Sequence, residues 1–175
     1  MLISRVLSVV VLAATALADV QAIAKAIEDI NEKTTSLEEA VVNYKTFFDW
    51  GPIGMRTLRL LDAVDKGHKL VKEEEALTPK DVIKLLRPTT DLSVSVMSTL
   101  KNLIAAKEKF KPKIFTNPII YANLVLQRKA TREFSKTLLE KIPEKSRGLA
   151  KTQIDPLAEA FDEAVEIYRP FYIPK

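Results

Sequence analysis

Apolar residues recur along most of this chain at alternating spacings of three and four, which is the period of one face of an α-helix. The first run of such positions is Val20, Ile23, Ile27, Ile30, Thr34, Leu37, Val41, Tyr44 and Phe48. This pattern predicts one long amphipathic helix that ends at residues 49–52, because Gly51 favours a helix end and Pro52 cannot continue one. No segment shows the alternation of apolar and polar residues that a half-buried strand needs, so the predicted fold class is all-α.

The rest of the chain predicts four more helices, separated by prolines and short polar turns. The expected ranges are about Ile53 to Glu75, Thr78 to Lys109, Ile120 to Pro143 and Glu144 to Tyr168, with a turn-rich connection over residues 111–118. Thr78 is expected to cap the third helix, with Pro79 in its first turn. Pro88 predicts a kink near Leu85, and Pro156 predicts a bend or a fresh start, because an internal proline loses a backbone hydrogen bond. Five helices joined by short loops form an antiparallel bundle.

The first 18 residues have the pattern of a secretory signal peptide. The basic Arg5 precedes an apolar run from Val6 to Leu17, and Ala16-Leu17-Ala18 is a small-x-small cleavage pattern. The run is shorter than the roughly 20 apolar residues that cross a membrane, so no transmembrane span is expected. Cleavage would leave 175 − 18 = 157 residues, which suits a single domain over residues 19–175 with a loosely ordered tail at 169–175. The expected location is outside the cell.

Composition narrows the class of protein. The sequence has no cysteine, so a secreted form must hold its shape by core packing alone, and 47% hydrophobic residues allow a large core. Its 27 basic and 23 acidic residues give a net charge of +4. The two signs are interspersed along the predicted helices instead of forming a basic stripe, so nucleic acid is not expected as a partner.

Reactive side chains are scarce, which argues against an enzyme. Catalytic triads and metal sites need histidines, cysteines or converging carboxylates, and His68 is the only histidine. His68 either meets a ligand head group inside the bundle or is a hydrogen-bonded structural residue, and the second alternative is favoured. Adjacent carboxylates at residues 73–75 point about 100° apart on a helix, so they favour a solvated charge run over an ion site. We expect no catalytic residue, no metal and no cofactor.

Polar residues interrupt the apolar seams at Thr34, Gln127 and Thr131. A buried polar group without a partner costs about 1 to 3 kcal/mol, so each of these must find one. In one interpretation, Gln127 and Thr131 lie one turn apart and hydrogen-bond a carboxylate or a water at the end of an apolar tunnel. In the other, which is favoured, the threonines bond their own helix carbonyls and Gln127 bridges to a neighbouring helix.

Two stretches of the sequence resemble a known family. The first contains Leu77, Thr78, Leu85, Pro88, Leu92, Val96, Leu100, Leu103, Ile104, Lys107 and Phe110, and the second contains Leu126, Gln127, Ala130, Phe134, Leu138, Lys141, Ile142 and Pro143. They resemble the third and fourth helices of the fungal hydrophobic surface-binding protein A family, which is related to the cell-wall galactomannoproteins. The resemblance covers essentially the whole mature chain. It implies a secreted or wall-associated protein that adsorbs to hydrophobic surfaces or encloses a fatty acid between its helices.

From this resemblance we expect a fatty acid, another apolar ligand or a hydrophobic surface as the partner. The predicted lipid-binding residues are Leu100, Leu103, Leu124, Gln127, Thr131, Phe134, Leu138, Leu157 and Phe161. A secreted helical module or effector that binds another protein is the alternative. The chain departs from the family in its many lysines and glutamates. It has no Asn-x-Ser/Thr site and no hydrophobic C-terminal tail for a lipid anchor, so a freely secreted or loosely wall-held form is expected.

Overall fold

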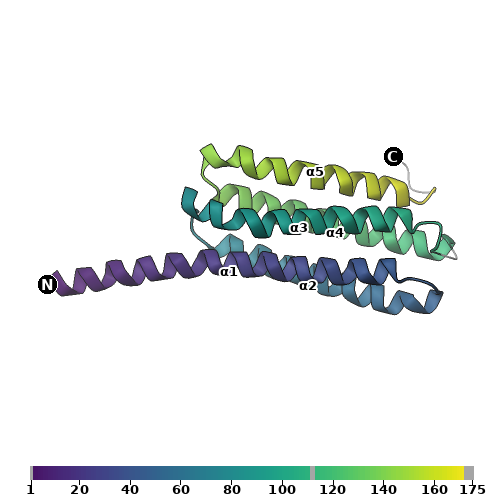
Figure 1. Ribbon diagram of the computed structural model, residues 1–175, viewed down its shortest axis with the longest axis horizontal. Coiled ribbons are helices and arrows are strands. Elements are labelled where there is room, and N and C mark those ends of the chain that lie inside the picture. Colours follow the sequence, from purple (N-terminus) through teal and green to yellow (C-terminus); the bar gives the residue numbers. More distant parts are fainter. Residues whose placement is uncertain (1, 111–112, 172–175) are drawn as a thin grey trace.

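Five α-helices form the fold in the part of the chain that the structure describes. The computed structural model describes the backbone of residues 2–110 and 113–171, and the side chains of these ranges except those of residues 2–19, 47 and 113–115. The helices are α1 Leu2–Val42, α2 Trp50–Glu73, α3 Pro79–Ala105, α4 Lys113–Lys141 and α5 Glu144–Tyr168, and the short 3-10 helix η1 Phe47–Asp49 precedes α2. Successive helices run in opposite directions (Figure 1), which confirms the predicted antiparallel all-α bundle.

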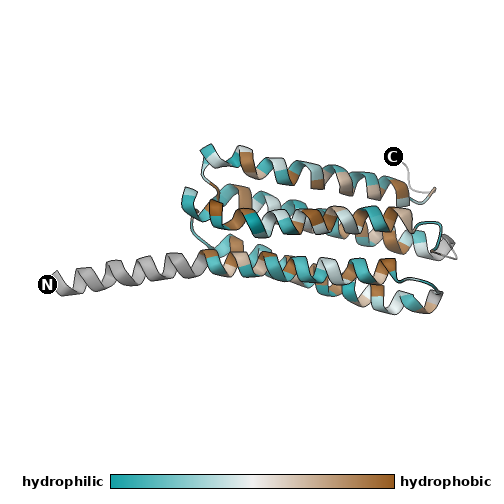
Figure 2. Ribbon diagram, viewed as in Figure 1, coloured by the Kyte–Doolittle hydropathy of each residue, from teal (hydrophilic) through white to brown (hydrophobic). Residues whose placement is uncertain are grey.

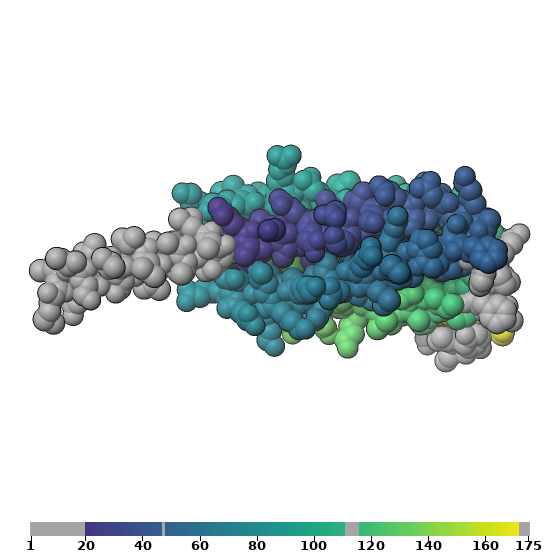
Figure 3. Space-filling view, turned by 90° about the horizontal axis from the view of Figure 1, so that it is seen from below, coloured from purple at the N-terminus to yellow at the C-terminus, as the bar shows by residue number. Residues whose placement is uncertain are grey.

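The helices are arranged as a ring. α1 packs against α2 and α3, α2 packs against α4, and α5 closes the ring by packing against both α3 and α4. Viewed from below, α1 and α2 lie side by side along the bundle (Figure 3). The coloured part of each helix carries both apolar and polar residues (Figure 2), and the buried apolar residues form one core inside the ring. A ring of five helices has a wider centre than a four-helix bundle, so more side-chain volume is needed to fill it.

The apolar seam of α1 is buried as predicted at every position from Val20 to Tyr44. Ile27, in the middle of this seam, is 0% exposed. The last predicted position is wrong, because Phe48 is 90% exposed. Phe48 follows the end of α1 and therefore does not share the face of that helix.

A turn ends α1 at Val42, earlier than predicted. The Asp49 carboxylate accepts hydrogen bonds from the backbone N–H groups of Lys45 and Thr46 at 2.8 and 2.7 Å. These backbone hydrogen bonds, that from Thr46 foremost, lower the pKa of Asp49. The carboxylate therefore fixes the connection between α1 and α2.

Three other predicted helix boundaries are corrected by the structure. Gly51 and Pro52 do not break a helix but lie in the first turn of α2, where backbone N–H groups have no partner inside the helix and a proline costs little. α4 begins at Lys113, so most of the predicted turn-rich connection is helical. Pro118 is tolerated there because it lies near the helix start and removes one hydrogen bond. α3 ends at Ala105, several residues before the predicted end, and the chain turns there.

The predicted start of α3 is confirmed. The Thr78 hydroxyl accepts a hydrogen bond from the Asp81 backbone N–H at 3.3 Å, and the Asp81 carboxylate accepts one from the Thr78 backbone N–H at 3.1 Å. The helix continues without interruption through Pro88. The Thr89 hydroxyl donates to the Leu85 carbonyl oxygen at 2.7 Å in the same turn. The kink near Leu85 stays a prediction.

The two ends of the chain differ in how much of them is described. α5 runs from Glu144 to Tyr168 as predicted, and it passes Pro156 without interruption. The Tyr168 hydroxyl donates to the Leu103 carbonyl oxygen at 2.6 Å, and burial raises the pKa of this tyrosine. Pro170 in the predicted tail is buried, and residues 172–175 lie outside the described part. The predicted signal peptide also lies outside the residues with described side chains.

No helix with described side chains is long and apolar enough to cross a membrane.

Candidate functional site

A narrow cavity lies at the centre of the ring, and all five helices line it. Its lining is mostly apolar and includes Ile30 of α1, Val64 of α2, Val96 of α3, Phe134 of α4 and Phe161 of α5. The space not filled by protein atoms amounts to about 850 Å³, including solvent at its opening.

Two smaller pockets share lining residues with this cavity and lie toward the two ends of the bundle. One shares Leu100 with the central cavity and extends to Trp50 at the start of α2. The other shares Leu138 with the cavity and extends to Val82 and Ile142, where α3 begins and α4 ends.

The predicted lipid-binding residues lie around this space. Those that line the central cavity are Leu100, Gln127, Thr131, Phe134, Leu138, Leu157 and Phe161. Leu103 and Leu124 line the smaller pocket toward Trp50 instead. The structure brings the predicted residues together from α3, α4 and α5, and their role as ligand contacts stays a prediction.

Three residues of the predicted apolar seams that line the cavity are less buried than the others. Leu92, Val96 and Ile154 belong to predicted apolar seams, yet each is only half-buried, and each lines the cavity. Ile23 and Ile27 of α1 are 0% exposed and lie outside the cavity lining. The interior is therefore closely packed at Ile23 and Ile27, whereas the cavity lies further along α1, from Ile30 onward, and between all five helices.

Polar side chains in the cavity lining fall into two groups. The hydroxyls of Thr34, Thr89 and Thr99 donate to carbonyl oxygens of their own helices at 2.7 to 2.9 Å. Within the described part of the chain, no side-chain hydrogen bond is made by Gln127, Thr131, Ser135 or Gln153. The favoured sequence interpretation is therefore confirmed for Thr34, but Thr131 does not bond its own helix and Gln127 does not bridge to a neighbour. All four polar residues without such bonds are on α4 and α5.

His68 has a structural role. Its Nε2 atom lies 3.0 Å from the Thr137 hydroxyl oxygen, which links α2 to α4, and His68 is not part of the cavity lining. This contact confirms the favoured interpretation of His68. Among the residues whose side chains are described, no cluster of three or more histidine, cysteine or acidic side chains could hold a metal ion.

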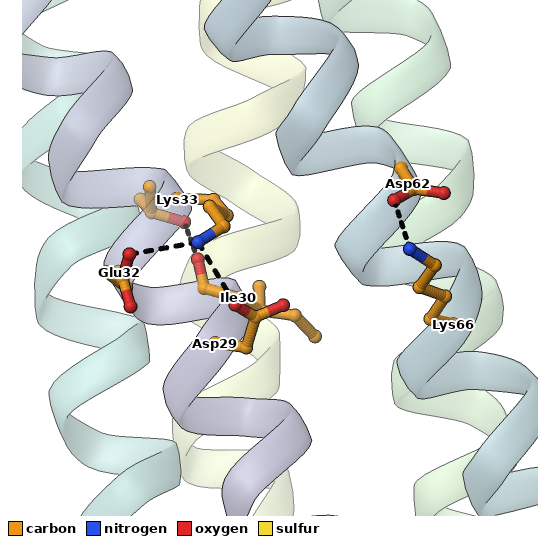
Figure 4. Close-up of polar contacts among 7 residues, drawn as sticks. Asp29, Ile30, Glu32, Lys33, Asp62 and Lys66 are labelled. Carbon is orange, nitrogen blue, oxygen red and sulfur yellow. Dashed lines mark hydrogen bonds and ion pairs between the residues drawn. The ribbon is translucent and has the colours of Figure 1, made fainter.

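Several charges on the outer faces of α1 and α2 form ion pairs within one turn of their own helix. The Lys33 ammonium lies 2.9 Å from the Glu32 carboxylate and 3.2 Å from the Asp29 carboxylate, and Lys66 lies 2.6 Å from Asp62 (Figure 4). Hydrogen bonds to these carboxylates raise the pKa of both lysines. Such pairs at a protein surface add little stability.

Sequence reasoning missed several residues of the lining. Ser135 continues the stripe of Gln127 and Thr131 by one more turn of α4, so its spacing is a signal that could have identified it. Gln153 precedes a seam residue of α5 and carries no comparable signal. The contributions of α1 and α2 to the lining depend on the order of helices in the ring, which the hydrophobic pattern does not specify.

A ring of five antiparallel helices around an apolar cavity defines a helical-bundle protein with room for a small apolar molecule. Residues 20–140 match the family model described as hydrophobic surface binding protein A, and the chain belongs to this family. The chain is 26% identical over 145 residues to cell wall mannoprotein 1 of Aspergillus fumigatus, a match that covers 82% of this chain and 50% of that relative. This chain therefore spans about half the length of that curated relative.

Solved structures share the fold. Ligand binding domain 1 of Penicillium marneffei MP1 protein, complexed with arachidonic acids, has a TM-score of 0.79 and 22% sequence identity, and the match covers 87% of this chain and 99% of that domain. The crystal structure of AFMP4P in complex with palmitic acid has a TM-score of 0.81 and 13% identity, covering 86% of this chain and 99% of that one. The ring of five helices is therefore common to these proteins despite low sequence identity.

Proposed function

We propose that this protein binds a fatty acid or a similar lipid in its central cavity. The observation that carries the proposal is the apolar cavity lined by all five helices, with Phe134 and Phe161 among its side chains. An acyl chain is long, narrow and apolar, and a mostly apolar cavity with a few polar groups suits such a ligand. The solved relatives in complex with arachidonic and palmitic acids support the same ligand class.

The tail of the ligand supplies most of the binding energy in this proposal. Burying about 14 methylenes at ~0.8 kcal/mol each gives ~11 kcal/mol. Association costs roughly 4 kcal/mol or more. The difference, about 7 kcal/mol or less, corresponds to a dissociation constant of about 10 µM or weaker. Chain length and cavity shape therefore dominate affinity, because an exposed ion pair at the head group adds at most about 1 kcal/mol.

The proposal also includes secretion, association with hydrophobic or wall surfaces, and no catalysis. Residues 1–18 carry the signal-peptide pattern, and the curated relative is a cell wall mannoprotein. The only histidine of the sequence contacts Thr137 outside the cavity, so it is not placed to activate a nucleophile there. The proposed role is therefore to hold or cover apolar matter.

The test is lipid extraction from the purified secreted protein, followed by mass spectrometry and by titration with a fatty acid whose fluorescence rises on burial. We expect extracted fatty acids or saturable uptake of the added one. A protein that yields no lipid, takes up no fatty acid and is not retained on a waxy surface would overturn the proposal.

A matched pair of valine substitutions on α3 tests whether the ligand lies inside the cavity. Val96→Trp adds a large side chain at a half-buried residue of the lining, and Val94→Trp adds the same side chain at a position that is 63% exposed. We expect Val96→Trp to weaken uptake and Val94→Trp to leave it unchanged. Circular dichroism and thermal unfolding of both variants separate a filled cavity from a misfolded chain.

A further inference from the structure

A groove on the outer surface between α4 and α5 lies directly outside the central cavity. It contains about 880 Å³ of space, including open solvent. The residues that line both the groove and the cavity are Thr131, Ser135, Ile154, Leu157 and Phe161. At this place a single layer of side chains therefore separates the cavity from solvent.

The groove is lined by more basic than acidic side chains. Its charged lining consists of Arg128, Arg132, Lys136, Arg147 and Lys151 together with the acidic Glu140. Asp162 beside the groove neutralises part of this charge, because its carboxylate accepts hydrogen bonds from Arg128 and Arg132 at 2.8 Å each. The positive charge that remains lies toward the turn between α4 and α5.

The cations near this turn have no carboxylate partner in the described part of the chain. Lys136 and Lys151 form no ion pair there, and the Arg147 Nε donates to the Ile142 carbonyl oxygen at 3.0 Å. Arg147 and Lys151 lie in the first two turns of α5, the end at which the helix dipole favours anions and disfavours cations. A bound anion would be attracted by both the side chains and the helix end.

The layer between groove and cavity also offers hydroxyl groups. Ser135 is 9% exposed, and neither its hydroxyl nor that of Thr131 makes a hydrogen bond within the described part of the chain. Both side chains border the groove and the cavity. They are therefore donors available to a carboxylate that lies at this boundary.

We propose that the groove is the mouth of the cavity and that Lys136, Arg147 and Lys151 hold the carboxylate of the fatty acid there. This inference rests on the proposed function, and it adds the position of the head group and the route of the ligand. The acyl chain passes Ser135 and Leu157 into the cavity. The carboxylate stays in contact with water, which avoids the large cost of burying a charge.

The first test compares palmitate with 1-hexadecanol, which has the same chain length and no charge, as competitors of a fluorescent fatty acid at low ionic strength. The unmodified protein should bind palmitate about three- to ten-fold more tightly, as expected for exposed ion pairs that salt screens. Combining Lys136→Gln, Arg147→Gln and Lys151→Gln should remove this preference and leave the affinity for hexadecanol unchanged.

A matched triple substitution on the outer face of α2 controls for net charge. It combines Arg59→Gln, Lys66→Gln and Lys69→Gln, all at exposed positions outside the groove. A preference for palmitate that survives the groove substitutions, or that falls equally with the α2 substitutions, would overturn the inference. Equal affinity of the unmodified protein for both competitors would also overturn it and would leave lipid binding intact. If the unmodified protein binds neither competitor, the proposed function itself is contradicted.

The second test addresses the route. Ala158→Trp places a large side chain in the groove at a residue outside the cavity lining, and Ala122→Trp places it at an exposed position of α4 outside the groove. We expect Ala158→Trp to slow uptake and release of the fluorescent fatty acid with its affinity little changed, and Ala122→Trp to alter neither rate. Unchanged rates in a folded Ala158→Trp protein would show that the ligand takes another route.

Discussion

The outer faces of the α1–α2 pair and the α4–α5 pair have similar composition and different organisation. On α2, Lys66 and Lys69 each lie 2.6 Å from an aspartate one turn earlier, so each cation is neutralised by its own helix. In the groove between α4 and α5, Lys136 and Lys151 have no such partner in the described part of the chain. A net charge of only +4 therefore conceals cations that differ in their partners, because Lys66 and Lys69 are paired within α2 and Lys136 and Lys151 are not paired in the described part of the chain. What a cation does depends more on its neighbours than on the total charge.

The interior likewise contains a closely packed part and a part that borders the cavity. Side chains of α1 such as Ile27 are 0% exposed, whereas Ile154 of α5 is half-buried because it borders the cavity. The closely packed positions of α1 thus differ from the cavity lining, to which Ile30 of α1 and Val64 of α2 also belong.

The largest effect is expected from truncating an apolar side chain, either in the closely packed part of the interior or beside the cavity. Ile27→Ala should cost about 3 to 5 kcal/mol of unfolding free energy, because it opens a void in close packing. Leu157→Ala should cost about 2 to 3 kcal/mol, because this side chain already borders empty space and loses fewer contacts. Urea unfolding of the lipid-free protein measures both values. An equal or larger loss at Leu157 would contradict the division of the interior.

An intermediate effect is expected from two glycines in helices. Gly148→Ala on α5 should stabilise the fold by about 0.5 to 1 kcal/mol, because alanine favours a helix and nothing lies within 4 Å of the added methyl group. At Gly67 on α2, the added carbon would lie 3.1 Å from the Ile30 Cδ1 and 3.4 Å from a ring carbon of Phe134. The gain from Gly67→Ala should therefore be smaller or reversed. Urea unfolding of both variants measures the difference, and equal gains would show that α2 is not tightly packed.

The smallest effect is expected from removing single surface cations. Lys66→Gln should lower the melting temperature slightly, and Lys136→Gln should leave it unchanged. Because the hydrogen bond to Asp62 raises the pKa of Lys66 above its ordinary value of 10.5, the pair stabilises the fold below that pH. This contribution is lost as the pH rises through the raised pKa. Thermal unfolding at neutral and at strongly alkaline pH tests this, and a persistent difference between the variants at alkaline pH would exclude the ion pair as its cause.

The fold could be predicted largely from the sequence, because helix faces depend on local spacing. The seam of α1 and the cap at Thr78 are local features, and both were predicted correctly. The start of α4 and the exposure of Phe48 were not, because they depend on turns fixed by side-chain contacts such as those of Asp49. Hydrophobic spacing is the same for a helix that packs solidly and for one that borders a cavity.

The candidate site could be predicted only in part, for the same reason. Gln127 and Thr131 were noticed because polar residues in an apolar seam must be accounted for, and both line the cavity. The groove between α4 and α5 was not foreseen. Its cations are spread over two helices, and their proximity depends on the packing of those helices around the ring.

Trp50 gives the protein a built-in optical property. It is the only tryptophan of the sequence, and its ring lies against Tyr44 and Phe110 at centroid distances of 5.8 and 5.2 Å. It also lines the smaller pocket that shares Leu100 with the central cavity. Its indole N–H is buried and makes no hydrogen bond within the described part of the chain. The tryptophan emission of the molecule thus originates from one indole at one end of the internal space, with a dipole sensitive to whatever fills that end.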